Sequence, residues 1–217
     1  RGVVGNLFGP LFGKQPNLNT IRGDKPRSAL EAIESFKKLR ALRPERLLTG
    51  HESISGADHI EREVTRIIDA VQWLHDRTLE GMNEGIELSR LMRDIKPPPE
   101  LALTEEYGKV SWNIRAIWHE YTGWFDPHRG ITELFAVPAS SVAADLAELA
   151  GGAEKLAERA ALYVGQGKPL EALHLLEIAL SATPRSADAG SVQRSALTPL
   201  LDQTGGNNIW ERLWIAA

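Results

Sequence analysis

Residues 107–126 have the sequence YGKVSWNIRAIWHEYTGWFD, and this stretch does most to decide the fold. It places Trp112, Trp118 and Trp124 at intervals of six residues and carries a glycine near each end. Large aromatic side chains at helical spacing are more often core or interface anchors than ligand cages, because each can bury ~150–250 Å² of surface. We therefore expect a helix from about Val110 to Trp124 that packs against other elements.

Outward from this helix, most of the chain also has helical periodicity, which predicts a mostly α fold. From about Ala57 to Glu80, apolar residues recur at near-heptad spacing in a stripe long enough to pack between subunits. The stripe consists of Ile60, Val64, Ile67, Val71 and Leu74. Another helix is expected after a cap at Asn83, and the prolines at 97–99 end it. Further helices are expected near residues 139–150, 153–165, 169–182, 187–203 and 207–216.

The N-terminal quarter of the chain has a different pattern, which is typical of an α/β unit. A helix is expected over residues 29–42, with Asp24 or Ser28 as its cap and Pro44 as its terminator. The run RLLTGH at 46–51 is short and apolar and is bounded by a proline and a glycine. This composition predicts a strand that ends in a tight turn.

Bulk properties limit the class of protein. The chain has 217 residues, enough for two small domains, and a formal net charge of −4 with its basic residues spread along the sequence. This distribution gives no electrostatic reason to expect nucleic acid as a partner. There is no cysteine, and no apolar run reaches the ~18–20 residues of a membrane span. The chain begins at Arg1, so we expect the natural N-terminus to lie upstream, and the sequence predicts no compartment.

The stretch at 107–126 resembles the signature of the dimerisation domain in alkyl sulfatases, which are hydrolases of the metallo-β-lactamase type. The resemblance extends to TLEGMNEG at 78–85, to NLNTIRG at 17–23 and to TGH at 49–51. It implies that residues 1–56 finish the hydrolase domain and that residues 57–217 form the helical dimerisation domain. The implied partners are a second copy in a homodimer, the rest of the metallo-β-lactamase-type domain and a small-molecule sulfate ester.

The same resemblance implies the roles of individual residues. Arg22 lies in the Thr-x-Arg-Gly segment that brings an arginine to the sulfate group, and Arg27 matches a nearby second position. A guanidinium suits a tetrahedral oxyanion because it donates two parallel hydrogen bonds and keeps its charge. His51 matches the last histidine ligand of a two-metal zinc site, which activates the water that hydrolyses the ester. Asn113 and Arg115 would orient their helix against the hydrolase domain.

The chain departs from the family pattern in its metal ligands. A single histidine cannot hold zinc, and the family's His-x-His-x-Asp-His cluster is absent. A ligating glutamate is expected about a dozen residues ahead of Thr-x-Arg-Gly, where this chain has Phe8, Gly9 and Pro10. We therefore expect the chain alone to be inactive. The remaining histidines that lie on or beside predicted helices, His59, His75 and His174, are expected to have structural roles.

Two other functions remain open from the sequence. The chain could serve a hydrolase of the same fold that acts on another ester, because a fold does not fix a substrate. Residues 153–184 also resemble one tetratricopeptide-like hairpin, so a non-catalytic helical module that binds a partner peptide is an alternative, although one hairpin cannot build a solenoid. If the dimerisation signature is correct, self-association is expected through residues 57–135, where the apolar stripe and the tryptophan helix lie.

Overall fold

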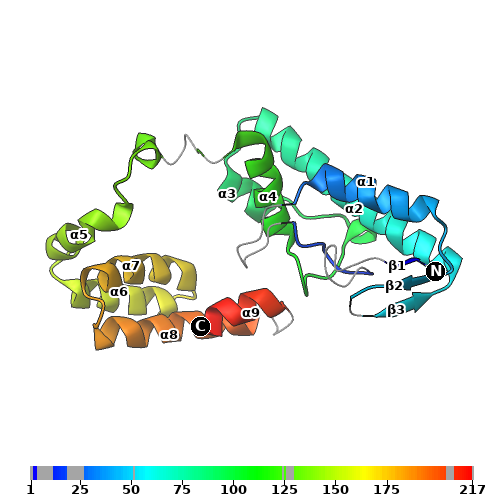
Figure 1. The fold of residues 1–217 in the computed structure, drawn as a ribbon. Helices are drawn as coiled ribbons and strands as arrows, with labels where there is room; N and C mark the ends of the chain where they lie inside the picture. Colours follow the sequence, from blue (N-terminus) through cyan, green and yellow to red (C-terminus); the bar gives the residue numbers. More distant parts are fainter. Residues whose placement is uncertain are drawn as a thin grey trace. The chain divides into compact units, whose positions relative to one another are not determined.

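The computed structural model describes residues 2–3, 12–18, 27–50, 52–123, 125, 130–203 and 208–216, and these residues confirm the mostly α fold (Figure 1). The chain divides into two compact units. Unit 1 consists of residues 1–128 and 208–210, and unit 2 consists of residues 129–207 and 211–217. The boundary predicted after residue 56, between a hydrolase domain and a dimerisation domain, falls inside unit 1. It stays a prediction.

Unit 1 begins with a small sheet and the helix that connects two of its strands. Strands β1 (Gly2–Val3) and β2 (Arg46–Leu48) are parallel, and helix α1 (Ala29–Ala41) lies between them in the sequence, which makes the expected α/β unit. The amide of Thr49 donates to the carbonyl of Glu52 (2.9 Å) and closes a tight turn after β2, as predicted.

A third strand, β3 (Ser53–Ser55), follows this turn and pairs with β2 in antiparallel register, with Leu47 opposite Ile54. The strand order is β1-β2-β3. The sequence pattern did not predict β3, because a single apolar residue between two serines is too short to show alternation. The side chain of Ile54 is buried and both serines are exposed, so the strand has one face on the core.

Helix α1 begins and ends close to the expected positions. Ser28 is its N-cap, and its hydroxyl accepts a hydrogen bond from the amide of Glu31 (3.3 Å), which satisfies one of the free amides of the first turn. The other candidate cap, Asp24, lies outside the described residues. The buried face of α1 packs along α2 (Ala57–Asn83). This face consists of Ala29, Ala32, Ile33, Phe36 and Leu39.

The prediction that the apolar stripe of helix α2 packs between subunits is wrong. Its apolar stripe is not available to a second subunit, because every member is at most 3% exposed within this chain. The five residues, Ile60, Val64, Ile67, Val71 and Leu74, belong to the same core as α1, β2 and α4. The periodicity identified the buried face correctly, but it could not identify α1 as the element that covers it.

The helices that follow α2 complete unit 1. Asn83 is the last residue of α2 and not the cap of the next helix; α3 (Leu88–Asp94) has Glu87 at its N-cap position. A short 3-10 turn, η1 (Pro99–Leu101), precedes α4 (Val110–Thr122), which packs against α2 and α3 (Figure 1). The packing role predicted for the tryptophan helix is confirmed at Trp118, which is 6% exposed, while Trp124 lies outside the described residues.

Unit 2 is helical throughout its described part. Two 3-10 turns, η3 (Ile131–Leu134) and η4 (Ala139–Val142), lead into α5 (Ala143–Leu149). Helices α6 (Ala153–Gly165), α7 (Pro169–Ala182) and α8 (Ala187–Gln203) pack on one another. The last described helix is α9 (Ile209–Ala216), whose first two residues belong to unit 1 and the others to unit 2. The expected α6–α7 hairpin is confirmed. Small residues fill its core, including Ala157, Ala160, Ala172 and Ala179.

Candidate functional site

Of the three predicted site residues, the structure describes one. Arg22 and His51 lie outside the described residues, and Arg27 immediately precedes the N-cap of α1. The backbone amide of Arg27 donates to the carbonyl of Leu18 (2.9 Å), and its Nη1 donates to the carbonyl of Asn17 (2.8 Å). Arg27 therefore braces the segment that enters the Thr-x-Arg-Gly motif, and its contact with a sulfate group stays a prediction.

The segment that leads to the Arg22 motif, residues 13–18, is here called the anchor segment. It runs beside residues 104–108, just before α4. The amide of Thr104 donates to Gly13 (2.7 Å), the amide of Gln15 donates to Thr104 (2.8 Å), and the amide of Gly108 donates to Gln15 (3.1 Å). These bonds join parts of the chain that are about ninety residues apart in sequence. The stretch 107–126 singled out in the sequence therefore begins next to the anchor segment in unit 1.

Asn113 of α4 forms the centre of this contact. Its side chain is fully buried, with 0% exposure. Its Oδ1 accepts a hydrogen bond from the amide of Leu18 (3.1 Å), and its Nδ2 donates to the carbonyl of Pro16 (2.9 Å) and lies 3.4 Å from Oε1 of Gln15. A buried amide group without such partners would destabilise the fold, so these bonds select one position for the anchor segment.

Gly108 permits the close approach of the two segments. A Cβ atom at this position would lie 2.1 Å from the carbonyl oxygen of Pro16 and 3.0 Å from the amide nitrogen of Asn17. Both neighbours are backbone atoms, so a side-chain rotation cannot relieve the clash. The glycine of the signature is therefore required by packing, independently of any preference of its own backbone.

The start of α4 is held from a second direction within unit 1. The carboxylate of Glu105 accepts a hydrogen bond from the amide of Val110 (2.7 Å), where a negative charge also complements the helix dipole. Nδ2 of Asn208 donates to the carbonyl of Glu105 (2.7 Å), and the Tyr107 and Trp210 rings meet edge to face at 5.7 Å. The turn before α4 is thus fixed between the anchor segment and residues 208–210.

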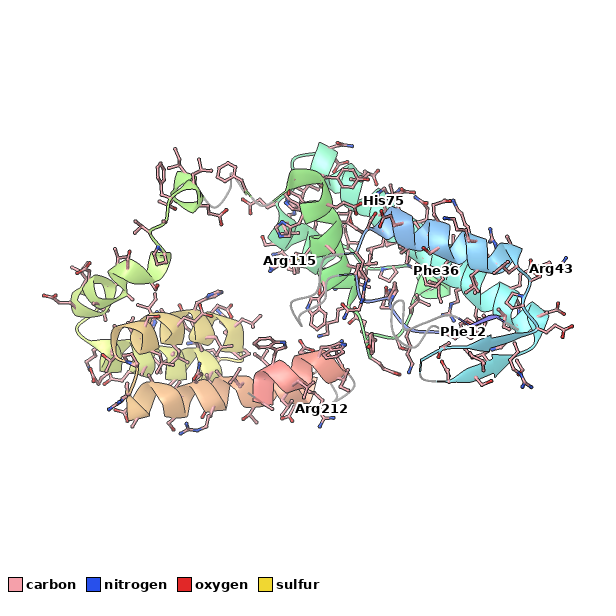
Figure 2. All side chains as sticks on the ribbon, in the orientation of Figure 1. Phe12, Phe36, Arg43, His75, Arg115 and Arg212 are labelled. Carbon is pink, nitrogen blue, oxygen red and sulfur yellow. The ribbon has the colours of Figure 1, made fainter. Side chains whose placement is uncertain are left out.

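The buried histidine of α2 has a structural environment, as the sequence indicated. His75 is 5% exposed and lies on α2 beside α4 (Figure 2). Its Nδ1 lies 3.0 Å from Oδ1 of Asp76, and its Nε2 lies 2.8 Å from the hydroxyl of Tyr121. Both ring nitrogens have protein partners, so this side chain has no nitrogen left for a metal ion.

The described residues do not fit a zinc site by themselves. Among them, no three histidine, aspartate or glutamate side chains are placed to hold a metal ion. Zinc requires three or four protein ligands, so a site that used His51 would need further ligands from outside this described set. None of the described helices is both long enough and apolar enough to span a membrane.

The sequence indicated part of this arrangement. Asn113 contacts the anchor segment, whereas Arg115 is exposed on α4 (Figure 2). Their orientation of α4 against a hydrolase domain stays a prediction. The part played by residues 208–210 was not predicted. The one signal in the sequence is Asn208, just before an apolar helix, and an asparagine at such a position usually indicates a turn or a helix cap.

Comparison with known proteins identifies the family. A family model described as alkyl sulfatase dimerisation matches residues 88–216. A linear primary-alkylsulfatase from Pseudomonas sp. (strain ATCC 19151) is 34% identical over 149 residues, which are 65% of this chain and 28% of that protein. An (R)-specific secondary-alkylsulfatase from Pseudomonas sp. is 26% identical over 208 residues, which are 92% of this chain and 31% of that protein.

A solved structure shows the same fold. The stereoselective inverting sec-alkylsulfatase Pisa1 from Pseudomonas sp. superposes with a TM-score of 0.80 at 24% identity, over 98% of this chain and 34% of that one. The chain thus spans about a third of the length of the relatives it matches. The family match covers the signature, the helix with Asn113 and all of the described part of unit 2. The chain belongs to the alkyl sulfatase dimerisation family.

Proposed function

We propose that this chain is the dimerising and substrate-positioning part of an enzyme that hydrolyses sulfate esters. The observation that carries the proposal is the buried contact between Asn113, in the matched family region, and the anchor segment that leads to Arg22. A region that served only for dimerisation would not need to hold this segment. The names of the relatives, which are alkylsulfatases, support the class of substrate.

Arg22 is the proposed ligand of the sulfate group. Its guanidinium would donate two parallel hydrogen bonds to the sulfate oxygens and would stay charged at every working pH. Arg27 is the proposed second cation. Its Nη1 donates to the carbonyl of Asn17, so its main contribution is to hold the anchor segment.

His51 is the proposed contribution of this chain to a zinc site. In the sequence it lies between β2 and β3, and its neighbours Thr49 and Glu52 are joined by a backbone hydrogen bond. In this proposal the other ligands come from outside the described residues, and bound zinc would supply an activated water.

The test of these roles uses the full-length protein and an alkyl sulfate. Arg22→Ala should lower kcat/KM by ~10–100-fold with bound metal unchanged, because a hydrogen bond to a charged group contributes ~1.5–3 kcal/mol. His51→Ala should lower the metal content and the turnover together. Unchanged kinetics in Arg22→Ala would reject the sulfate role and would favour another ester as substrate. Full metal content and activity in His51→Ala would reject the zinc role.

We also propose that the chain forms a homodimer through residues 131–149 of unit 2, here called the apolar arm. The arm has many exposed large apolar side chains, namely Ile131, Leu134, Phe135, Val137, Val142, Leu146 and Leu149. Bonds within the arm close its turns, such as that from the amide of Phe135 to Thr132 (3.1 Å). Many exposed large apolar side chains within one short segment are typical of protein interfaces, and the dimerisation family match includes the whole arm.

Sedimentation of matched variants tests this interface. Phe135→Asp should convert the dimer to monomers, because it places a charge in the apolar contact. Leu42→Asp is the control, since Leu42 is as exposed as Phe135 but lies at the end of α1 in unit 1. A monomeric wild-type chain would reject the proposal. Equal dissociation by both variants would move the interface away from the arm.

A further inference from the structure

We infer that the apolar arm of one copy docks on the turn between α6 and α7 of a second copy, through apolar contacts and contacts between opposite charges. The inference rests on the proposed homodimer, and it names the surface of the partner that the arm contacts. This surface is here called the turn patch, and it consists of Arg159, Leu162, Lys168 and Leu170.

The charged residues of the apolar arm all have the same sign. Between Ile131 and Leu149 the sequence has three acidic residues, Glu133, Asp145 and Glu148, and no lysine, arginine or histidine. Asp145 and Glu148 are exposed on α5, and neither forms an ion pair with any residue that the structure describes. Asp145 precedes Leu149 by four residues, so a carboxylate shares one face of the helix with an exposed leucine. The arm is therefore both apolar and acidic.

A contact between two copies of the arm would bring like charges together. When a single segment forms a two-fold interface, that segment meets its own copy. The acidic residues of both arms would then lie in one interface, and the arms contain no cation to offset them. Juxtaposed like charges oppose association, so the arm requires a partner surface that is apolar and positively charged.

The turn patch has these properties. From Arg159 to Leu170 the sequence has two cationic residues and no aspartate or glutamate. Arg159 and Lys168 are exposed, and neither is paired with a carboxylate of the described part of the chain. Leu162 and Leu170 are 57% and 59% exposed. The patch thus combines exposed leucines with unpaired cations, which complements the leucines and unpaired carboxylates of the arm.

Bonds within unit 2 hold the turn patch in place. The guanidinium of Arg159 lies 5.4 Å from the centre of the Tyr163 ring, and Leu162 follows Arg159 by three residues on the same face of α6. The amide of Lys168 donates to the carbonyl of Tyr163 (2.9 Å), and the amide of Gln166 donates to that of Leu162 (3.1 Å). A turn that is ordered in advance loses little conformational entropy when a partner binds.

Another basic surface, at the end of α1, fits the arm less well. It has Arg40 and Arg43 next to the exposed Leu42. However, Nη1 of Arg40 already donates to the hydroxyl of Thr65 (3.0 Å), and Nη2 of Arg43 lies 4.0 Å from a carboxylate oxygen of Glu61. The end of α1 also lies outside residues 88–216, the region that matches the dimerisation family, whereas the arm and the turn patch lie inside it.

The same contact occurs twice in a closed dimer. Each copy has one arm and one turn patch, so two-fold symmetry pairs the arm of either copy with the turn patch of the other. The assembly then closes at two subunits and leaves no arm free for a third.

Charge reversal in the full-length protein tests this pairing. The arm variant carries Asp145→Lys and Glu148→Lys, and the turn variant carries Arg159→Glu and Lys168→Glu. Each variant should form a homodimer ~100-fold weaker than that of the wild type, because its arms and turn patches then have like charges. An equimolar mixture of the two variants should form a heterodimer of near wild-type affinity, since every contact again joins opposite charges. Sedimentation equilibrium measures these affinities.

The matched control carries Arg185→Glu and Arg194→Glu. It makes the same change of charge at two exposed cations of unit 2 that lie outside the turn patch, so its dimer should stay close to wild type. Far-UV circular dichroism verifies that every variant keeps its helices. A folded turn variant that dimerises as well as this control would overturn the inference, and so would a mixture that stays monomeric. A monomeric wild-type protein would instead overturn the proposed homodimer.

The salt dependence of the wild-type dimer provides an independent test. The Debye length falls from ~10 Å at 0.1 M salt to ~3 Å at 1 M, so the Kd of the dimer should rise by ~10-fold over this range of sodium chloride. A purely apolar contact would not weaken in this way. A Kd that stays constant or falls would overturn the ionic part of the docking.

Discussion

The two units of the chain use different means to define their cores. Unit 1 buries polar side chains among its apolar ones, and every such residue in the described chain belongs to this unit. They are Gln15, Asn17, His75, Thr78, Asn113 and Asn208. The core of unit 2 consists largely of alanines from α5 to α8, with Leu156 and Leu176. Directional bonds select one arrangement of distant segments in unit 1, whereas small side chains let helices pack closely in unit 2.

The two units also differ in how many large apolar side chains they expose. Most of the exposed large apolar side chains of the described chain belong to unit 2, including those of the apolar arm, Leu162 and Leu170. Unit 1 has few, such as Leu42. A unit with a small core and much exposed apolar surface can gain stability from a partner. Unit 1 is therefore held together by its own buried contacts, whereas unit 2 is suited to association with another protein surface.

The largest expected effect is in the core of unit 2. Leu176→Ala should lower the free energy of unfolding of this unit by ~2–5 kcal/mol, because Leu176 is fully buried among alanines that cannot fill the cavity. Urea unfolding followed by far-UV circular dichroism should show an early loss of helix. Tryptophan fluorescence, to which five of the six tryptophans contribute from unit 1, should keep its midpoint. A shared midpoint shift would show that the two units unfold together.

The next largest effect is expected at Gly108, where the backbone packs closely against Pro16. Gly108→Ala should lower the free energy of unfolding of unit 1 by ~1–3 kcal/mol, because the new methyl group meets the backbone of Pro16. The measurement is the urea midpoint of tryptophan fluorescence. Gly165→Ala at the end of α6 is the control for an added methyl group, since a Cβ atom there meets nothing within 4 Å; because Gly165 belongs to unit 2, its unfolding is followed by far-UV circular dichroism. Equal responses to the two substitutions would mean that packing at Gly108 is looser than described.

A smaller effect is expected at the start of α1. Ser28→Ala should cost about 1 kcal/mol of unfolding free energy in unit 1, because it removes the cap of the Glu31 amide. Ser28→Asp should restore most of the loss, since aspartate caps equally well. Thermal unfolding of the three proteins provides the measurement, and a Ser28→Asp chain as unstable as Ser28→Ala would contradict the capping role.

The smallest effect is expected from a surface ion pair of unit 2. Nζ of Lys155 lies 2.7 Å from Oε2 of Glu158, but both side chains are largely exposed. Lys155→Ala should therefore change the unfolding free energy by less than ~0.5 kcal/mol. A larger loss in urea unfolding would show that unit 2 depends on surface charge as well as on its alanine core.

Local pattern predicted the elements better than their partners. The helices α4, α6, α7 and α8 lie near their expected positions, since their apolar spacing is regular over many residues. The same spacing could not show that α1 covers the stripe of α2, because an apolar helix face has the same sequence pattern whether the element that covers it is in the same chain or in another. β3 and the start of α3 depend on two or three residues each, too few for any period to appear.

The candidate site shows a similar limit. The motif around Arg22 and the Asn113 helix were both visible in the sequence, and an orienting role for Asn113 was expected. The sequence could not show that Asn113 binds the backbone at Pro16 and Leu18, because the contact joins segments that are about ninety-five residues apart. Nor could it show the close approach at Gly108, since a glycine before a helix is equally typical of a simple turn.

Residues 208–210 belong to unit 1, although the residues on either side of them in the sequence belong to unit 2. A stop codon after residue 203 would leave the helices α5 to α8 complete, yet it would remove the Asn208 amide from Glu105 and the Trp210 ring from Tyr107. Such a truncation would therefore harm the distant signature before it harmed the helices next to the cut. Deletions that reach residues 208–210 therefore act on unit 1.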